Sequence, residues 1–403
     1  MQSAERGAEA HAGRVAPPRP AGQGDMMSKL IPALLALLLA ACAARPAEVR
    51  VRFDAGGATA VEARGLADRR TGRRVTADDP VRIASVSKLV VALGVMRLVE
   101  AGRLDLDRDV SDALGWRLRN PAFPDQPITL RLLLGHRSSL TDGADYIVPL
   151  GERLRDRVAD PRAWDAAHAP GAYFRYANVN FPVIASVVER VTGERFDRAT
   201  KRLVLDPLGV AGCFNWASCD DATVARAVTL YRVNGEVATD DLRGRRPECP
   251  VVTKSACDLE AYRLGENGAL FSPQGGLRVS MRGLARIGQM LLRNGDGFLR
   301  PESIAELERS AWTFDGANGD TADGFYCRYG LATQRLATPV AGCRDDPFGG
   351  ERIGHAGEAY GLRSGLWLDR TRGRGVAFFA TAVKDGDVGR RSAYATAEER
   401  LGR

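Results

Sequence analysis

The pattern of hydrophobic and polar residues predicts β-structure at both ends of the chain. Apolar residues occupy every second position from Val49 to Phe53, so residues 47–65 are expected to be extended. Near the C-terminus, two apolar runs at 362–368 and 376–382 are separated by a polar, glycine-containing stretch, a pattern typical of a β-hairpin. A final helix is predicted over residues 392–401.

The region between these ends is predicted to be mainly helical. Apolar side chains surround residues 84–101 almost completely, which indicates a helix buried in the core and ended by Gly102. Further helical patterns, broken by Pro and Gly, occur at 129–134, 183–191 and 280–292.

This order of elements predicts a mixed α/β (α+β) domain over residues 47–403. Its antiparallel sheet is expected to combine the segments 47–104 and 325–403, flanked by helices. A mainly helical subdomain, residues 105–324, is inserted between them.

The first 42 residues are predicted to lie outside this domain. Residues 1–25 are rich in Gly, Ala, Pro and Arg and are expected to be disordered or to precede the true start codon. Residues 26–42 combine a lysine, a short leucine-rich run and small residues, as a secretory signal does. Their end, Leu39-Ala40-Ala41-Cys42, resembles the lipobox of bacterial lipoproteins. This resemblance implies lipidation of Cys42 and a protein anchored to a membrane on the periplasmic side; the alternative is a buried helix that begins a cytosolic domain.

Charge and length exclude several functional classes. The chain has 403 residues and a formal net charge of +7, and no apolar run reaches the roughly 18 residues of a membrane span. The basic residues are mostly arginine, scattered and interleaved with Asp and Glu, whereas a nucleic-acid binder usually concentrates them on one element. We therefore expect no nucleic-acid partner.

Six cysteines follow the predicted signal, and an even number is typical of an oxidising compartment. Pairing between sequence neighbours is favoured because each pair closes a short loop. Metal binding is the alternative, but no C-x-x-C pair and no nearby histidine support it. We expect neither a metal nor another cofactor. The expected pairs are Cys213–Cys219, Cys249–Cys257 and Cys327–Cys343.

The strongest chemical signal is the S-x-x-K tetrad Ser85-Val86-Ser87-Lys88 at the start of the predicted buried helix. Residues i and i+3 share a helix face, so the lysine amine can lie beside the Ser85 hydroxyl. Burial lowers the pKa of a lysine, which lets it act as a base toward a serine nucleophile. In the alternative interpretation, Ser85 only caps the helix.

Two later motifs change this balance. Tyr176-Ala177-Asn178 lies in a polar stretch before a predicted helix, and His355-Ala356-Gly357 precedes a predicted strand. The three motifs in this order resemble those of the penicillin-recognising serine hydrolases. With Tyr-x-Asn as the second motif, the chain is most similar to class C β-lactamases and to the carboxypeptidases and esterases of the same fold. The segments 132–140 and 275–292 also resemble conserved parts of that family.

The resemblance implies a β-lactamase/transpeptidase-like fold and a role for each motif residue. Ser85 would attack the carbonyl of a small-molecule or peptide substrate, and Lys88 and Tyr176 would move the proton, with the base left open between them. Asn178 would hold the substrate amide. An oxyanion hole would be formed by the backbone N–H groups of Ser85 and Glu358, the residue after Gly357.

The third motif departs from that of many β-lactamases, which have lysine where this chain has His355. A charged histidine would attract a substrate carboxylate weakly and in a pH-dependent manner. A D-alanyl peptidase or an esterase is therefore favoured. The alternatives are a true class C-like β-lactamase and a non-catalytic protein that binds cell-wall peptide. Another histidine, His136, is expected to have a structural role.

Overall fold

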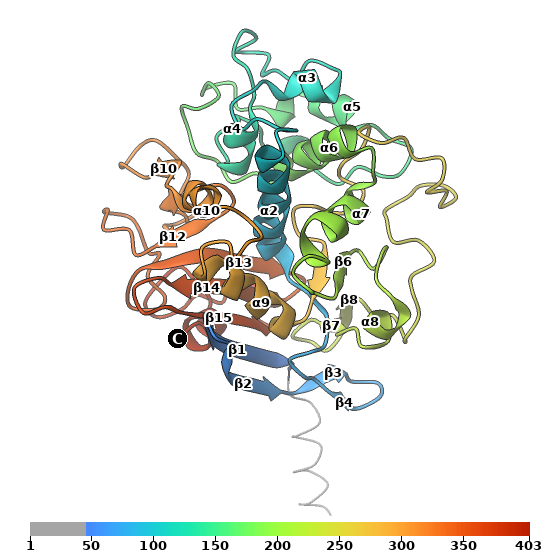
Figure 1. Ribbon diagram of the computed structural model, residues 1–403, viewed down its shortest axis with the longest axis vertical. Helices are drawn as coiled ribbons and strands as arrows, with labels where there is room; N and C mark the ends of the chain where they lie inside the picture. Colours follow the sequence, from blue (N-terminus) through green and yellow to red (C-terminus); the bar gives the residue numbers. More distant parts are fainter. Residues whose placement is uncertain (1–45) are drawn as a thin grey trace, which may run out of the picture. The chain divides into compact units, whose positions relative to one another are not determined.

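The computed structural model describes residues 46–403, so the predicted signal segment and Cys42 lie outside the described residues. Its largest sheet has eight antiparallel strands (Figure 1). The strands, in spatial order, are β10 (Trp312–Thr313), β11 (Arg328–Tyr329), β12 (Gln334–Leu336), β13 (Arg352–Ala359), β14 (Leu362–Asp369), β15 (Arg374–Ala380), β1 (Glu48–Asp54) and β2 (Ala58–Arg64).

The two ends of the chain meet in this sheet. Strand β1 pairs with β15 along its whole length, with Val51 opposite Ala377, and it pairs with β2 on its other side. Strands β14 and β15 form the hairpin expected at the C-terminus. The prediction of one sheet built from N- and C-terminal segments is confirmed.

Both faces of the sheet are covered, because side chains alternate between the two faces of a strand. Leu366 and Phe379 belong to the main core, whereas Trp367 and Phe378 belong to a second core on the other face. The helices that pack against these strands are α9 (Met281–Leu292) and α11 (Thr396–Leu401). Because α9 packs on the sheet and β10 joins it, the sheet part of the chain begins before the expected boundary at residue 325.

The helical part surrounds one central helix, α2 (Ser87–Glu100), which follows the single turn η1 (Ala84–Val86) (Figure 1). Eleven of the fourteen residues of α2 are buried, as the all-round apolar pattern predicted. The other helical elements are α3 (Val110–Leu114), α4 (Leu130–Leu134), η2 (Asp142–Ala144), α5 (Leu154–Val158), η3 (Pro161–Ala163), α6 (Asn180–Thr192), α7 (Phe196–Thr200), η4 (Lys201–Leu205), α8 (Asp221–Ala225) and α10 (Pro301–Glu308).

A small sheet fixes the chain just before α2. Strand β5 (Val81–Arg82) pairs with β9 (Leu277–Val279), and β9 pairs in turn with β6 (Gly212–Phe214). Arg82 lies opposite Arg278 in this sheet. Two further hairpins join β3 (Leu66–Asp68) to β4 (Arg73–Arg74) and β7 (Leu230–Tyr231) to β8 (Val237–Thr239).

Three disulfides join the six cysteines as sequence neighbours, which is the pairing expected from the short loops. They are Cys213–Cys219, Cys249–Cys257 and Cys327–Cys343. Three disulfides indicate an extracellular or periplasmic protein. Within residues 46–403, no helix has both the length and the apolar character needed to cross a bilayer.

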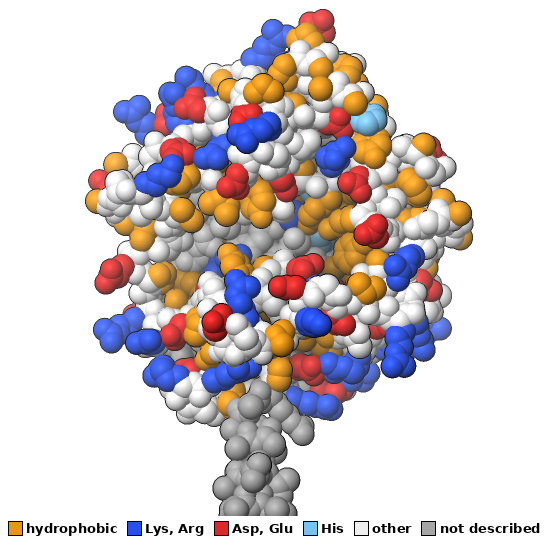
Figure 2. All heavy atoms as spheres, turned by 180° about the vertical axis from the view of Figure 1, so that it is seen from behind, with side chains coloured by type: hydrophobic (Ala, Val, Ile, Leu, Met, Phe, Trp, Pro, Cys, Tyr) orange, Lys and Arg blue, Asp and Glu red, His pale blue; other side chains and the backbone are white. Residues whose placement is uncertain are grey.

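Positive and negative side chains are interspersed on the face drawn in Figure 2, in keeping with their mixing along the sequence. The same face is hollowed near its middle, and hydrophobic side chains gather beside the hollow (Figure 2).

Candidate active site

Ser85 lies in a strained turn between strand β5 and helix α2. The residue before it, Ala84, has a positive φ of 46°. An L-residue in this conformation costs free energy, and such strain persists where the surrounding structure holds it in place. Here the Ser364 hydroxyl donates to the backbone oxygen of Ile83 at 2.8 Å and ties the turn to strand β14. The position of Ser85 is therefore fixed by the sheet as well as by α2.

Lys88 lies one turn further along and is fully buried. Its Nζ is 3.0 Å from Ser85 Oγ and 2.9 Å from Asn178 Oδ1. A third contact, at 2.8 Å, is with the backbone oxygen of Gln274. Burial lowers the pKa of Lys88 to about 7, although the carboxylate of Asp142 opposes this shift.

These contacts direct the lone pair of a neutral Lys88 toward Ser85. An uncharged amine has two N–H donors and one lone pair. Asn178 Oδ1 and the backbone oxygen of Gln274 can only accept hydrogen bonds, so the two N–H groups of the amine donate to them. The lone pair then faces the Ser85 hydroxyl, which can donate its proton along the 3.0 Å contact.

Asp142 holds the Tyr-x-Asn segment in place, a role that the sequence analysis missed. Its carboxylate accepts from the backbone N–H groups of Asn178 and Val179, at 2.9 and 3.0 Å, and from Asn178 Nδ2 at 3.0 Å. The Asn178 amide is thus fixed between Asp142 and Lys88. One proton of Nδ2 remains for another acceptor, because an amide nitrogen carries two.

Tyr176 lies in a stack of three rings beside Lys88. Its ring centroid is 4.2 Å from that of His136 and 4.5 Å from that of Tyr326, and Lys88 Nζ is 4.8 Å from it. Burial raises the pKa of the Tyr176 phenol above its usual value, while Ser85 and Tyr326 act in the opposite direction. The raised pKa keeps the phenol protonated, and because its oxygen makes no hydrogen bond of normal geometry within the described residues, its O–H is free to donate.

The third motif lies on strand β13, which runs against the turn that carries Ser85. A Cβ on Gly357 would lie 2.3 Å from Ser364 Oγ and 2.4 Å from the backbone oxygen of Ile83. Only glycine allows this approach. The approach brings the backbone at Gly357 and Glu358 beside Ser85, and all three residues line one cavity.

His355 lies behind this cavity. It is buried, its Nε2 is 2.8 Å from the Tyr329 hydroxyl, and its Nδ1 contacts the backbone oxygen of Ala356. Burial, reinforced by the positive charge of Lys88, lowers the pKa of His355 to about 3. The expected attraction between a charged His355 and a substrate carboxylate does not fit this placement, because the ring is neutral and faces the core.

His136 has the structural surroundings expected of it. Its Nδ1 accepts from the backbone N–H of Ala177 at 3.0 Å, and its ring stacks on Tyr176. Burial lowers its pKa well below the usual value. The His136 ring therefore packs against the Tyr176 ring and helps to hold it in place.

Two cavities meet at Ser85, Tyr326 and Glu358, which line both of them. We call the cavity of about 950 Å³ between the segment 319–326 and strand β13 the first lobe. The second lobe, of about 850 Å³, lies on the side of Tyr176 and Asn178 and extends to Trp216 and the segment 239–252.

Comparisons with known proteins identify the family of this chain. Esterase EstB of Burkholderia gladioli is 29% identical over 350 residues, which are 81% of this chain and 83% of that protein. The solved structure of EstCE1, a hydrolase with promiscuous acyltransferase activity, has a TM-score of 0.65 at 20% identity and covers 93% of this chain and 96% of its own. The solved structure of the D-amino acid amidase of Ochrobactrum anthropi SV3, complexed with L-phenylalanine, has a TM-score of 0.64 at 18% identity. The match covers 93% of this chain and 96% of the amidase chain. The model of the Beta-lactamase family matches residues 49–400, and this chain belongs to that family.

Proposed function

We propose that this protein is a serine hydrolase that cleaves carboxylic esters or amides through an acyl-enzyme on Ser85. The contact between Lys88 Nζ and Ser85 Oγ carries the proposal, because the amine has a pKa of about 7 and its lone pair faces the hydroxyl. As Lys88 takes the hydroxyl proton, a bond forms between Ser85 Oγ and the substrate carbonyl carbon. Among the two residues that could act as the base, Lys88 is favoured, because the pKa of Tyr176 is raised.

Tyr176 acts in the second half of this step. When the bond from the carbonyl carbon to the leaving oxygen or nitrogen breaks, the leaving atom must gain a proton. The Tyr176 phenol supplies it and is then reprotonated by Lys88, whose Nζ lies 4.8 Å from the centroid of the Tyr176 ring. Water then attacks the acyl-enzyme, and the same groups return the proton to Ser85.

Two further groups bind the substrate. The backbone N–H groups of Ser85 and Glu358 form the oxyanion hole, a role supported by the close approach of Gly357 to the turn at Ile83. Asn178 donates its remaining Nδ2 proton to a substrate carbonyl, since its other polar contacts are occupied by Asp142 and Lys88.

An ester or an unstrained amide fits the site better than a β-lactam. In the third motif, His355 is neutral and bonded to Tyr329, so it offers no positive charge to the carboxylate of a penicillin. Similarity to an esterase and to an amidase points in the same direction. The favoured activities are those of an esterase, or of a D-alanyl peptidase in which a group other than His355 binds the terminal carboxylate of the peptide.

Labelling and turnover test this proposal together. A fluorescent fluorophosphonate should label the wild-type protein and leave Ser85→Ala unlabelled. A panel of p-nitrophenyl butyrate, a D-alanyl-D-alanine peptide and a chromogenic cephalosporin should show turnover of the ester or the peptide and little of the cephalosporin. Faster hydrolysis of the cephalosporin would favour a β-lactamase. Binding of the peptide without labelling or turnover would favour a non-catalytic binding protein.

The membrane anchor is a separate proposal that rests on the sequence Leu39-Ala40-Ala41-Cys42. Lipidation of Cys42 would attach several acyl chains, and more than one chain is needed for stable anchoring. Radiolabelled palmitate should be incorporated into the full chain and not into Cys42→Ser, which should leave the membrane fraction. Equal labelling of both proteins would exclude this anchor.

A further inference from the structure

The second lobe is lined by an arginine that is in no ion pair among the described residues. Five charged residues line this lobe, and each of its three carboxylates is paired with an arginine. These ion pairs are Asp240–Arg278, Asp241–Arg243 and Glu358–Arg363. The remaining charged residue, Arg82, forms no ion pair within residues 46–403.

Arg82 is held in place, yet its hydrogen-bonding capacity is little used. Within the described residues, its guanidinium makes one hydrogen bond, from Nη1 to the backbone oxygen of Gly275 at 3.0 Å. Its Nε has no partner. The ring of Tyr360 lies 5.0 Å from its Cζ and restricts its movement. A guanidinium carries five N–H donors, so most of them remain for a ligand.

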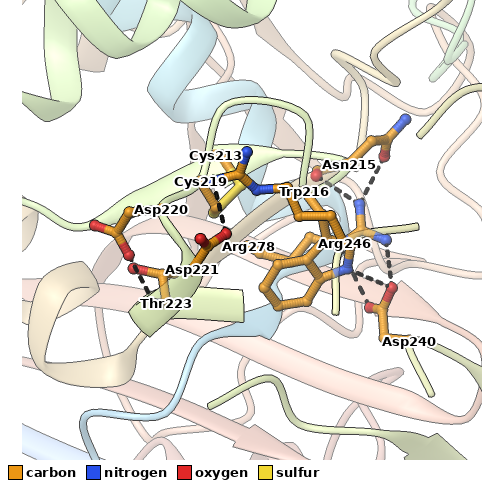
Figure 3. Close-up of a disulfide and its surroundings, with 11 residues drawn as sticks. Cys213, Asn215, Trp216, Cys219, Asp220, Asp221, Thr223, Asp240, Arg246 and Arg278 are labelled. Carbon is orange, nitrogen blue, oxygen red and sulfur yellow. Dashed lines mark hydrogen bonds and ion pairs between the residues drawn. A yellow bond between two sulfur atoms is a disulfide. The ribbon is translucent and has the colours of Figure 1, made fainter. Parts of the chain in front are cut away.

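Asp240 attracts Arg82 electrostatically, but its hydrogen bonds go to other residues. Asp240 accepts from Arg278 Nη2 and from Trp216 Nε1, both at 2.8 Å. The Cys213–Cys219 disulfide closes the short loop that carries Trp216, and Figure 3 shows the loop beside Asp240. Burial and, after it, the positive charge of Arg278 lower the pKa of Arg82, and the negative charge of Asp240 offsets them only in part. An anion in the lobe would relieve both effects.

Arg82 is also close enough to Ser85 to contact the same substrate. The two residues are three positions apart, so their Cα atoms are separated by at most about 11 Å. The rim of the lobe carries exposed apolar side chains, Ile147, Val252 and Tyr360. A small organic molecule with an apolar body, a scissile carbonyl at Ser85 and an anionic end at Arg82 would match these features.

We propose that the second lobe selects esters or amides that carry a carboxylate, and that Arg82 binds that carboxylate. This inference rests on the proposed function of Ser85 and names the substrate class of the same site. The two oxygens of an Asp or Glu carboxylate can accept two parallel hydrogen bonds from one guanidinium. A substrate carboxylate can pair with Arg82 in the same way.

Matched ester pairs test the proposal. One pair is mono-p-nitrophenyl glutarate and neutral p-nitrophenyl pentanoate; the other is 4-butanoyloxybenzoate and its neutral methyl ester. In at least one pair, the wild-type protein should prefer the anionic member in kcat/KM. Arg82→Gln should reduce that preference by about 10- to 100-fold, the usual effect of a hydrogen bond to a charged group. Arg74→Gln, which removes an exposed arginine outside the lobe, should leave it unchanged.

A binding measurement separates this inference from the proposed function. Ser85→Ala cannot form the acyl-enzyme, but it should bind monomethyl glutarate at least tenfold more tightly than dimethyl glutarate in calorimetry. This outcome supports the carboxylate site even where the wild-type protein hydrolyses neither ester pair. Equal or absent binding of the two glutarates, or an anionic preference that Arg82→Gln retains, would overturn the inference.

Discussion

Asn178 donates from Nδ2 to the Asp142 carboxylate at 3.0 Å, and this contact fixes the amide that orients Lys88. Asp142 also raises the pKa of Lys88 by its negative charge. The two effects are separable, because one concerns position and the other concerns protonation.

Asp142→Asn should therefore change activity in two ways. Loss of the carboxylate loosens the Tyr-x-Asn segment, and a displacement of about 1 Å near the reacting atoms can cost about 10²-fold in kcat/KM. Without the negative charge the pKa of Lys88 falls further, so the rising limb of the pH–activity profile moves to lower pH. Asp125→Asn, an exposed position with no such contact, should change neither quantity. A loss of activity without a shift of the profile would contradict the electrostatic role.

The expected pH profile of the wild-type protein follows from the proposed role of Lys88 as the base. Lys88 must be neutral to accept the Ser85 proton, and its pKa is about 7. We expect kcat/KM to be low in acid and to rise with pH through about 7, before other groups titrate. Steady-state kinetics between pH 5 and 9 on a neutral ester measure this limb. A profile that is flat across this range would show that Lys88 does not act as the base.

Tyr176→Phe removes a hydroxyl and retains the ring that stacks between His136 and Tyr326. Proton donors of this kind contribute about 10²- to 10⁴-fold, so kcat should fall by that factor. Thermal unfolding should change little, because the phenol makes no regular hydrogen bond within the described residues. Tyr326→Phe is the informative comparison, since its ring adjoins that of Tyr176. A larger loss in Tyr326→Phe would transfer the donor role to that residue.

The sequence predicted the parts of the site whose chemistry depends on local spacing. Ser85 and Lys88 are separated by one helical turn, and their contact follows from that spacing alone. The sheet was predictable for a similar reason, because the alternation along 48–54 and the two apolar runs of the C-terminal hairpin indicate its strands.

Long-range packing determined what the sequence could not show. Gln274 contributes a backbone oxygen, which carries no residue-type signal, and Asp142 looks like one of many scattered acidic residues. His355 could be read as a surface cation until the fold placed Tyr329 against its ring. In each case the partner comes from a distant segment, so its identity depends on the tertiary structure.

The Cys213–Cys219 disulfide should support both stability and the second lobe. Closing a loop of this length contributes about 2 kcal/mol to the free energy of unfolding in the chain-entropy model. The double variant Cys213→Ser/Cys219→Ser should therefore unfold at lower denaturant. Because the loop carries Trp216, KM should also rise for substrates that occupy the second lobe. The Cys327→Ser/Cys343→Ser variant is the matched control, because neither cysteine lines that lobe. Equal effects of both double variants on KM would argue against a specific role for the Trp216 loop.

Gly357→Ala tests how closely the third motif must approach the nucleophile. The added Cβ would lie 2.3 Å from Ser364 Oγ and 2.4 Å from the backbone oxygen of Ile83, so the strand or the Ser85 turn must shift. Gly57→Ala makes the same chemical change in open space and should have no effect. We expect a fall in kcat/KM of about 10²-fold in Gly357→Ala, because the oxyanion donors move relative to Ser85. Labelling by a fluorophosphonate should slow in parallel, since it uses the same donors. Full activity in Gly357→Ala would mean that strand β13 does not help to form the oxyanion hole.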